Sequence, residues 1–586
     1  MNLGRARWLS LLALSLGISM IIVDATIVNV AIPSIVRDLG LDGSGAEWIV
    51  SIYPLVFAAL LITLGRTGDV LGRKRLYVFG LVTFVGASLL AGLAPTGPLL
   101  VGARILQGVG GAAIAPATQS ILNATFRGRE RAIAFAVYGS VIGGMAALGP
   151  LLGGWLVTNA TWRWAFLVNL PIGIVALVAT LLWVKESRDE GARAGFDAPG
   201  FVTLSLGLAA VVFGLIEGYS YGWLAPSKPF AIAGWSWPLA SVSIIPFAFA
   251  AGLALIAAFV VIERRRQRVG TFILFDFTLW QNPSFRFGNL TATIVALGEF
   301  GLLFALPLFL QGVLGYSAFE TGLVFVSLAI GAFVAAPIAG GLAHRYEPRR
   351  VVQIGMALEA VGVLATALLL APGVSGLVLA VPLFVYGMGV GFATAQLANV
   401  VLSEVPPARS GLASGANSTM RQIGSALGIA ILGTVLFATL VNGTSTNITA
   451  ALPNTDPACV QLITTLVDQS AGQILPALRN PSAGGGADFA GAVGSLPPEQ
   501  AACFRDPAFL ASLPKTVVPI ETAFVDATRL AGFVASGFVL VGVVLSLLLP
   551  EMPKNAEREV VAADVPGSGK RDGSGDEGDG AEGAAA

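Results

Sequence analysis

Fourteen stretches of about twenty mostly apolar residues follow one another along the 586-residue chain. Their approximate limits are 9–32, 46–65, 76–94, 98–122, 132–157, 165–184, 199–217, 239–262, 287–311, 320–342, 351–371, 376–402, 411–440 and 525–549. A helix needs roughly 20 such residues to cross the hydrocarbon core of a bilayer. An outer-membrane barrel would show alternating segments about ten residues long instead. The pattern predicts an all-α polytopic membrane protein with fourteen transmembrane helices.

The charge content excludes the main soluble classes. Only 12% of the residues are charged, against about 25% in soluble proteins, and 34 Lys and Arg balance 34 Asp and Glu. We therefore expect neither a soluble enzyme nor a nucleic-acid binder. The sequence contains no Gly-x-x-x-x-Gly-Lys-[Ser/Thr] phosphate loop and no Gly-x-Ser-x-Gly nucleophile elbow. It predicts a protein that is not an enzyme, holds no cofactor, and takes its energy from an ion gradient.

The positive charges indicate how the chain lies in the membrane. With an even number of spans both termini share one side, and 25 of the 34 Lys and Arg residues fall on that side. Because positive loops stay inside, we expect both termini in the cytoplasm of a bacterial cell and the spans in its plasma membrane. The first stretch is too long for a signal peptide and contains Asp24, so we interpret it as a retained helix.

A glycine-rich basic segment occurs twice. Residues 65–75 read GRTGDVLGRKR after the second span, and residues 340–350, GGLAHRYEPRR, follow the tenth as a degraded echo. Such repeats suggest two related halves with a substrate site between them near mid-bilayer, although short basic loops also recur in any polytopic protein. The predicted organisation is listed by residues: a six-helix bundle at 1–184, an inserted helix pair at 185–270, a second six-helix bundle at 271–550, and a disordered cytoplasmic tail at 551–586.

The segment 441–524 between the last two spans is predicted to be a long extracytoplasmic loop. It contains both cysteines of the chain, Cys459 and Cys503, and two cysteines in an oxidising compartment suggest one disulfide. The loop is interpreted either as a spacer or as a module that binds an extracytoplasmic partner. With His344 the only histidine and both cysteines outside, we expect no metal site. His344 is expected to be solvated in a cytoplasmic loop.

The segment 65–75 resembles the cytoplasmic signature loop of the major facilitator superfamily. Its glycines, Gly65 and Gly72, permit a tight turn and close helix approach. Asp69 can accept hydrogen bonds from a neighbouring helix N-terminus, and Arg73 can pair with a carboxylate. The resemblance implies a gating latch that breaks when the transporter switches; the alternative is a simple positive anchor.

Further segments resemble the fourteen-helix drug:proton antiporters of that superfamily, the multidrug efflux transporters. Those segments are 24–33, DATIVNVAIP; 161–173, TWRWAFLVNLPIG; 311–318, QGVLGYSA; and 411–417, GLASGAN. Residues 104–112, RILQGVGGA, resemble the buried-arginine motif of the superfamily as a whole. A glycine-rich segment of the fifth span is similar to the antiporter motif, with Gly139, Gly143, Gly149, Pro150, Gly153 and Gly154. The resemblance implies the major facilitator fold with two inserted helices, and a fifth span that seals the bundle against a proton leak.

Ionisable residues inside a membrane are costly and mark candidate functional sites. Asp24 and Glu299 lie in the opening helices of the two predicted bundles, so symmetry would place both beside a central cavity. We expect both to take part in proton coupling; a structural hydrogen-bonding role for Asp24 and substrate binding by Glu299 are the alternatives. Arg104 is expected to bond the first helix and tune Asp24, or simply to tie helices together. Glu359 is assigned a packing or water-exposed role on a peripheral helix.

The predicted function is proton-coupled export of lipophilic compounds, with cationic drugs and amphiphiles favoured, by alternating access. The alternative is export of a lipid, a siderophore or a self-made secondary metabolite by the same fold. The expected partners are a small lipophilic substrate, protons and the lipid bilayer, and the protein is expected to act as a monomer.

Overall fold

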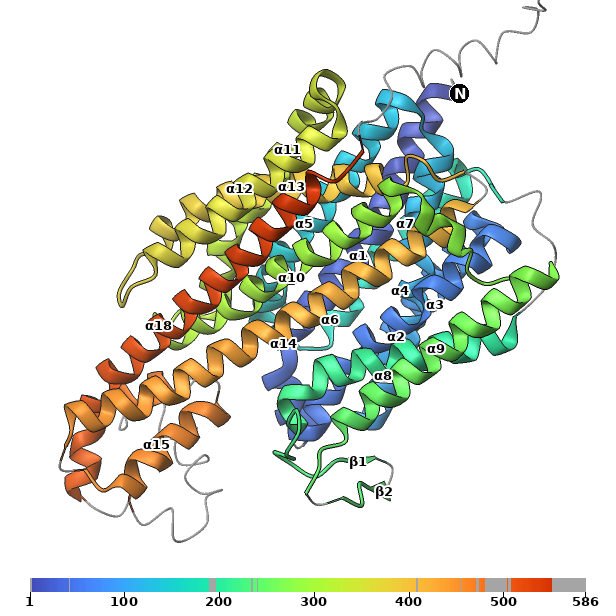
Figure 1. Ribbon diagram of the computed structural model, residues 1–586. Helices are drawn as coiled ribbons and strands as arrows, with labels where there is room; N and C mark the ends of the chain where they lie inside the picture. Colours follow the sequence, from blue (N-terminus) through green and yellow to red (C-terminus); the bar gives the residue numbers. More distant parts are fainter. Residues whose placement is uncertain are drawn as a thin grey trace, which may run out of the picture. The chain divides into compact units, whose positions relative to one another are not determined.

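The computed structural model describes residues 3–39, 41, 43–188, 197–232, 235–239, 241–406, 409–453, 455–470, 474–479, 503 and 507–550. Residues 1–550 form one compact unit, shown in Figure 1. The predicted tail at 551–586 lies outside the described residues, as do the burial of Gly143 and the side chains of Pro150 and His344.

Long helices make up the unit, in three successive groups. The first group is α1 (Leu3–Leu39), α2 (Gly43–Leu71), α3 (Arg73–Gly92), α4 (Gly97–Thr125), α5 (Gly128–Asn159), α6 (Trp164–Leu167) and α7 (Asn169–Trp183). The second is α8 (Ala198–Tyr221), the strands β1 (Ala231–Ile232) and β2 (Trp235–Ser236), and α9 (Ile245–Val269). The third is η1 (Phe277–Gln281), α10 (Pro283–Gly312), α11 (Ala318–Tyr346), α12 (Pro348–Leu369), α13 (Gly376–Val401), α14 (Ser410–Ala451), α15 (Pro457–Gln469), α16 (Leu475–Arg479) and α18 (Pro507–Ser546).

The membrane-spanning prediction is confirmed. Among the described residues, 13 helices are long and apolar enough to cross a membrane, and they coincide with thirteen of the fourteen predicted stretches. The remaining stretch, 132–157, lies within α5, a 32-residue helix. The sequence did not predict the short antiparallel hairpin in which Ala231 pairs with Ser236 between α8 and α9.

Glycines bring helices of the first and third groups into close contact. A Cβ on Gly322 of α11 would lie 2.9 Å from the backbone of Leu151 in α5, and one on Gly144 would lie 2.3 Å from the ring of Phe333. Small residues at such positions let apolar helices pack in lipid without a hydrophobic driving force. α2 packs against α14 in a similar way, while α8 packs chiefly on α9 and also touches α2 and α14. The division at residues 184 and 270 stays a prediction.

The segment 441–524 is more helical than expected. α14 continues to Ala451, and α18 begins at Pro507 rather than near residue 525, so the two helices are longer than the predicted spans, and the loop boundaries at 441 and 524 stay a prediction. Apolar packing accounts for the extra length: Ile448 of α14 and Phe524 of α18 are fully buried, in one cluster with residues of α15.

Candidate functional site

Asp24 of α1 is the centre of a buried polar network. Its Oδ2 accepts a hydrogen bond from Arg104 Nη1 of α4 at 2.5 Å. Its Oδ1 accepts from Gln107 Nε2 at 2.9 Å and from Asn169 Nδ2 at 2.7 Å. Both amides also donate to Ser88 Oγ of α3. Asp24 is fully buried, and the network joins four helices around one carboxylate.

Besides Asp24, Arg104 contacts a backbone carbonyl and two aromatic rings. Its Nε donates to the carbonyl oxygen of Ile49 at 3.2 Å, and its guanidinium carbon lies 4.4 Å from the ring centre of Tyr53 and 6.0 Å from that of Phe166. Arginine stays protonated in proteins, so the network contains a permanent positive charge. Removing the negative partner would leave that charge buried without compensation, which is strongly unfavourable. The structure thus brings Arg104 and Asp24 together as the sequence predicted.

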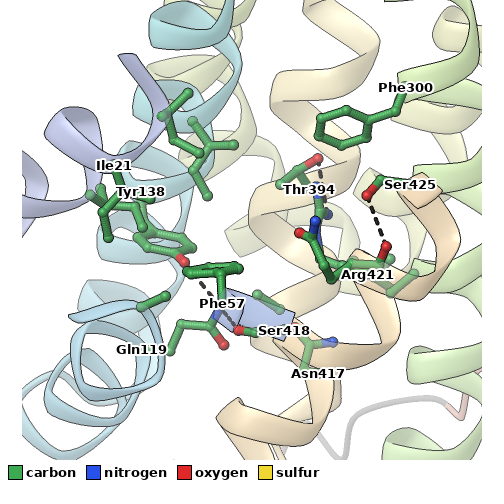
Figure 2. A pocket seen from close by; sticks show the side chains of 18 residues that line it. Ile21, Phe57, Gln119, Tyr138, Phe300, Thr394, Asn417, Ser418, Arg421 and Ser425 are labelled. Carbon is green, nitrogen blue, oxygen red and sulfur yellow. Dashed lines mark hydrogen bonds between the residues drawn. The ribbon is translucent and has the colours of Figure 1, made fainter. Parts of the chain in front are cut away.

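A cavity of about 100 Å³ lies between helices of the first and third groups. Figure 2 shows Tyr138 and Gln119 on one side of it, and Thr394 and Arg421 on the other. The remaining lining residues are Ile18, Ile21, Ile22, Phe57, Ala115, Ile142, Ala292, Phe300, Leu397, Ala398, Asn417, Ser418, Gln422 and Ser425. The wall is mostly apolar with a few polar groups, the usual character of a small-molecule site.

Glu299 of α10 reaches the cavity through an ion pair. Its Oε2 lies 3.6 Å from Arg421 Nη2 of α14, and both side chains are largely buried. Arg421 lines the cavity, as does Phe300, the neighbour of Glu299. Asp24 is one turn from Ile21, which also lines it. Glu299 is thus paired with a cavity-lining residue, whereas the buried carboxylate of Asp24 is bonded to residues of α4 and α7 within the first group of helices.

Glu359 of α12 does not fit the expectation of water exposure. Its exposed fraction is 0%, and its backbone N lies 2.4 Å from where a Cβ on Gly389 of α13 would stand. The interpretation of a water-exposed Glu359 is therefore wrong, because the close glycine contact places α13 over it.

The predicted gating loop forms a closed contact between α2 and α14. Asp69 accepts hydrogen bonds from the backbone N–H groups of Gly411 and Leu412, both at 2.8 Å, and from Arg73 Nη2 at 2.8 Å. A carboxylate at a helix N-terminus is favourable because of the helix dipole. A Cβ on Gly65 would lie 2.5 Å from the carbonyl oxygen of Gly411, so only glycine permits this approach.

Gly72 makes the turn that follows. Its φ of 114° is a conformation that favours glycine. The next residues are held by Glu186, whose oxygens accept from the backbone N–H of Lys74 at 3.0 Å and of Arg75 at 3.2 Å. Gly72 and Glu186 therefore fix the turn between α2 and α3.

The antiporter motif packs α5 on α1 around Asp24. A Cβ on Gly149 would lie 1.7 Å from Thr26 Oγ1, and one on Gly153 would lie 2.8 Å from Ile27 Cγ1. Gly139 and Gly154 are buried in the same helix. These contacts put the motif beside the residues that follow Asp24.

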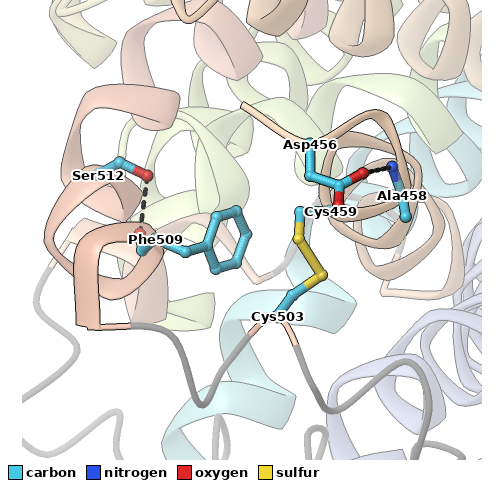
Figure 3. The surroundings of a disulfide bond; sticks show 6 residues. All are labelled: Asp456, Ala458, Cys459, Cys503, Phe509 and Ser512. Atoms are coloured by element: carbon cyan, nitrogen blue, oxygen red, sulfur yellow. Dashed lines mark hydrogen bonds between the residues drawn. A yellow bond between two sulfur atoms is a disulfide. The ribbon is translucent and has the colours of Figure 1, made fainter. Parts of the chain in front are cut away.

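The two cysteines form a disulfide bond, and both come after the last cavity-lining residue in the sequence. Cys459 Sγ and Cys503 Sγ are 2.04 Å apart, and Figure 3 shows Phe509 of α18 directed toward the bond. The disulfide ties the segment after α15 to the helical cap formed by α14, α15 and α18.

Three residues of the Asp24 network were not predicted from sequence. Gln107, Asn169 and Ser88 are neutral polar residues in apolar helices, and nothing about them in isolation distinguishes a ligand from a helix-packing residue. A signal was nevertheless present, because Gln107 lies in the segment that resembles the superfamily's buried-arginine motif and Asn169 in one that resembles the fourteen-helix antiporters.

Comparison with known proteins gives a consistent result. The family model described as Major Facilitator Superfamily matches residues 14–274 and 197–429. The chain is 31% identical over 540 residues to the multidrug resistance protein Stp of Mycobacterium tuberculosis, covering 92% of this chain and 91% of that protein. It is 31% identical over 431 residues to the tetracenomycin C resistance and export protein of Streptomyces glaucescens, covering 73% and 76% of the two chains.

A solved structure supports the fold alone. The crystal structure of the human organic anion transporter MFSD10 (TETRAN) is similar with a TM-score of 0.53 at 14% sequence identity, covering 73% of this chain and 93% of that one.

Proposed function

Because this chain belongs to the major facilitator superfamily, with multidrug and antibiotic-resistance transporters among its relatives, we propose that it exports lipophilic cations and related amphiphiles in exchange for protons. The observation that carries this proposal is an apolar cavity between the two groups of helices, with Arg421 of the buried Glu299–Arg421 pair at its wall and the buried Asp24–Arg104 pair on two of the helices that line it. The apolar wall suits a lipophilic molecule, and the acids suit protons and positive charge.

The proton step is assigned to Asp24. In the closed arrangement its carboxylate is neutralised by Arg104 and bonded to two amides. When the helices separate and water enters, the bond to Arg104 lengthens and the carboxylate can take a proton. This loading takes place from water on the outer side. When the cavity next opens to the cytoplasm, the bond to Arg104 forms again and the proton leaves to the water there, because the guanidinium stabilises the charged form. Each cycle thereby moves one proton inward for outward movement of substrate.

The latch sets which side is closed. The contact of Asp69 with α14 is accompanied at the same end by other polar contacts between the two groups of helices. Arg131 Nε donates to Asn399 Oδ1 at 2.8 Å, and Gln396 Nε2 donates to the carbonyl oxygen of Ala132 at 3.2 Å. By the distribution of Lys and Arg we assign that end to the cytoplasm of a bacterial cell. In this arrangement the cavity is closed toward the cytoplasm.

Reconstitution tests the proposed function. Purified protein in liposomes with an acidic lumen should accumulate ethidium in the lumen, since protons leaving would drive the cation in. Accumulation should stop when an ionophore collapses the pH gradient, and protein-free liposomes are the control. Equal ethidium uptake with and without the pH gradient would contradict proton coupling.

A second cargo class is favoured by one relative, whose name describes export of tetracenomycin C. Under this alternative the chain exports a self-made metabolite, a lipid or a siderophore, and hands it to a partner through the cap around α15. Replacing residues 454–506 with a Gly-Ser linker keeps α14 and α18 intact. Ethidium export should survive the replacement, whereas loss of metabolite release with dye export retained would favour the alternative.

A further inference from the structure

Glu359 is a buried acid to which the proposed proton step gives no role. It lies in the middle of α12, a helix apolar and long enough to span the membrane, and its exposed fraction is 0%. Both of its carboxyl oxygens lack a hydrogen-bond partner within the described part of the chain. Burying an ionised carboxylate in this condition is very costly, so the side chain is stable here only with a proton on it.

Few titratable side chains lie on the helices that surround Glu359. α12 packs against α13, α18 and α11. Tyr386 is the single titratable residue of α13, α18 has none between Leu530 and Leu549, and α11 has them only at its two ends. Beyond these helices, Glu299 of α10 and Arg421 of α14 lie within electrostatic reach of Glu359.

Tyr386 contacts both helices that carry the two acids. Its hydroxyl donates to the backbone carbonyl of Glu299 at 3.1 Å. Its backbone packs on Gly362, one turn from Glu359, where an added Cβ would lie 2.5 Å from Tyr386 N. Tyr386 therefore lies between α10 at Glu299, the partner of the cavity-lining Arg421, and α12 one turn from Glu359.

The charges of this group do not balance without a proton. Arg421 supplies one positive charge, whereas Glu299 and Glu359 can supply two negative ones. The ion pair at 3.6 Å assigns the arginine to Glu299. Two interacting carboxyls of this kind titrate as a pair rather than singly.

We propose that Glu359 is a second proton-binding site, which shares one exchangeable proton with Glu299 beside Arg421. The proposal rests on the proposed proton-coupled function. The proton arrives from water in the cavity and is held by one of the two carboxyls. It returns to water when the cavity opens to the other side. A cation in the cavity would repel Arg421 from its wall and shift the proton between the acids, which links substrate charge to proton release.

A purely structural acid is the competing explanation. It would hold its proton at every pH, and glutamine would replace it without effect on any titration. pH-induced infrared difference spectroscopy on the purified full-length protein, without substrate, distinguishes the two. The carbonyl band of a protonated carboxylic acid should decrease as pH rises in the wild type. Glu359→Gln should lose part of that change, and Glu299→Gln should shift its midpoint.

A control variant and a second substitution of Glu359 complete the test. Glu404→Gln removes an exposed carboxyl of the same half and should leave the buried-acid band unchanged. If Glu359→Gln does not fold, Glu359→Asp should keep a titrating band at a shifted frequency, which assigns the band to this residue. A band identical in wild type and Glu359→Gln, or one that does not titrate, would overturn the proposal. Because no substrate is present, this outcome is independent of whether ethidium export by the wild type is coupled to protons.

Discussion

The carboxylate of Asp24 and the guanidinium of Arg104 form a fully buried ion pair, with Oδ2 and Nη1 2.5 Å apart. The pair joins α1 to α4, and neither charge has access to water in this arrangement. Under the proposed function, Asp24 is the carboxyl whose surroundings change between states, as proton exchange requires.

Breaking the pair from one side should destabilise the protein. Asp24→Asn leaves Arg104 charged and buried, which costs about 3–5 kcal/mol for a buried pair. The double variant Asp24→Asn/Arg104→Gln should recover part of that loss. Thermal unfolding in detergent measures both. Glu130→Gln is the control, because the half-exposed ion pair of Glu130 with Arg7 is expected to contribute only about 0–1 kcal/mol. Equal losses of stability in Asp24→Asn and Glu130→Gln would refute the role of burial.

Gly65→Ala should prevent closure of the latch. The new Cβ would stand 2.5 Å from a backbone oxygen of α14, which cannot rotate away. We expect slower ethidium export with normal folding, and a longer spin-label distance between the facing ends of α2 and α14. The control is Gly86→Ala, where an added Cβ meets nothing within 4 Å. An unchanged distance distribution in Gly65→Ala would contradict the packing argument.

The disulfide should stabilise the cap without taking part in transport. Cys459 and Cys503 are 44 residues apart in sequence, and closing such a loop contributes about 3–4 kcal/mol in the chain-entropy view. Cys459→Ser/Cys503→Ser should lower the unfolding midpoint, and a reductant should lower it in the wild type alone. Ethidium export should be retained at low temperature; its loss there would give the cap a role in transport.

The contact between the end of α1 and the turn before α6 should depend on pH. A hydrogen bond from Trp162 and then one from Arg163 lower the pKa of Asp38. Its stabilising contribution is therefore complete above the unfolded pKa of about 3.9 and is lost as pH falls through the lower folded value. Unfolding midpoints of wild type and Asp38→Asn should differ at neutral pH and converge in strong acid. A difference that persists in acid would exclude the carboxylate as its source.

Much of the fold could be predicted because membrane crossing imposes a strict length and polarity. The latch could also be predicted, since Asp69 and its glycines occur in an unmistakable segment. The position of Glu359 could not, because one acid on an apolar helix does not reveal which neighbour covers it. The extent of α14 and α18 was missed because the Ala-, Gly- and Pro-rich composition of 441–524 conceals the apolar residues that pack against α15, such as Ile448 and Phe524.

The most direct measurement of the central claim compares uphill transport with exchange in Asp24→Asn. In liposomes with an acidic lumen, the wild type should accumulate ethidium and Asp24→Asn should not. Both should still exchange labelled for unlabelled ethidium without a pH gradient, because exchange needs the cavity and the latch but no net proton movement. Full uphill accumulation by Asp24→Asn would contradict the account.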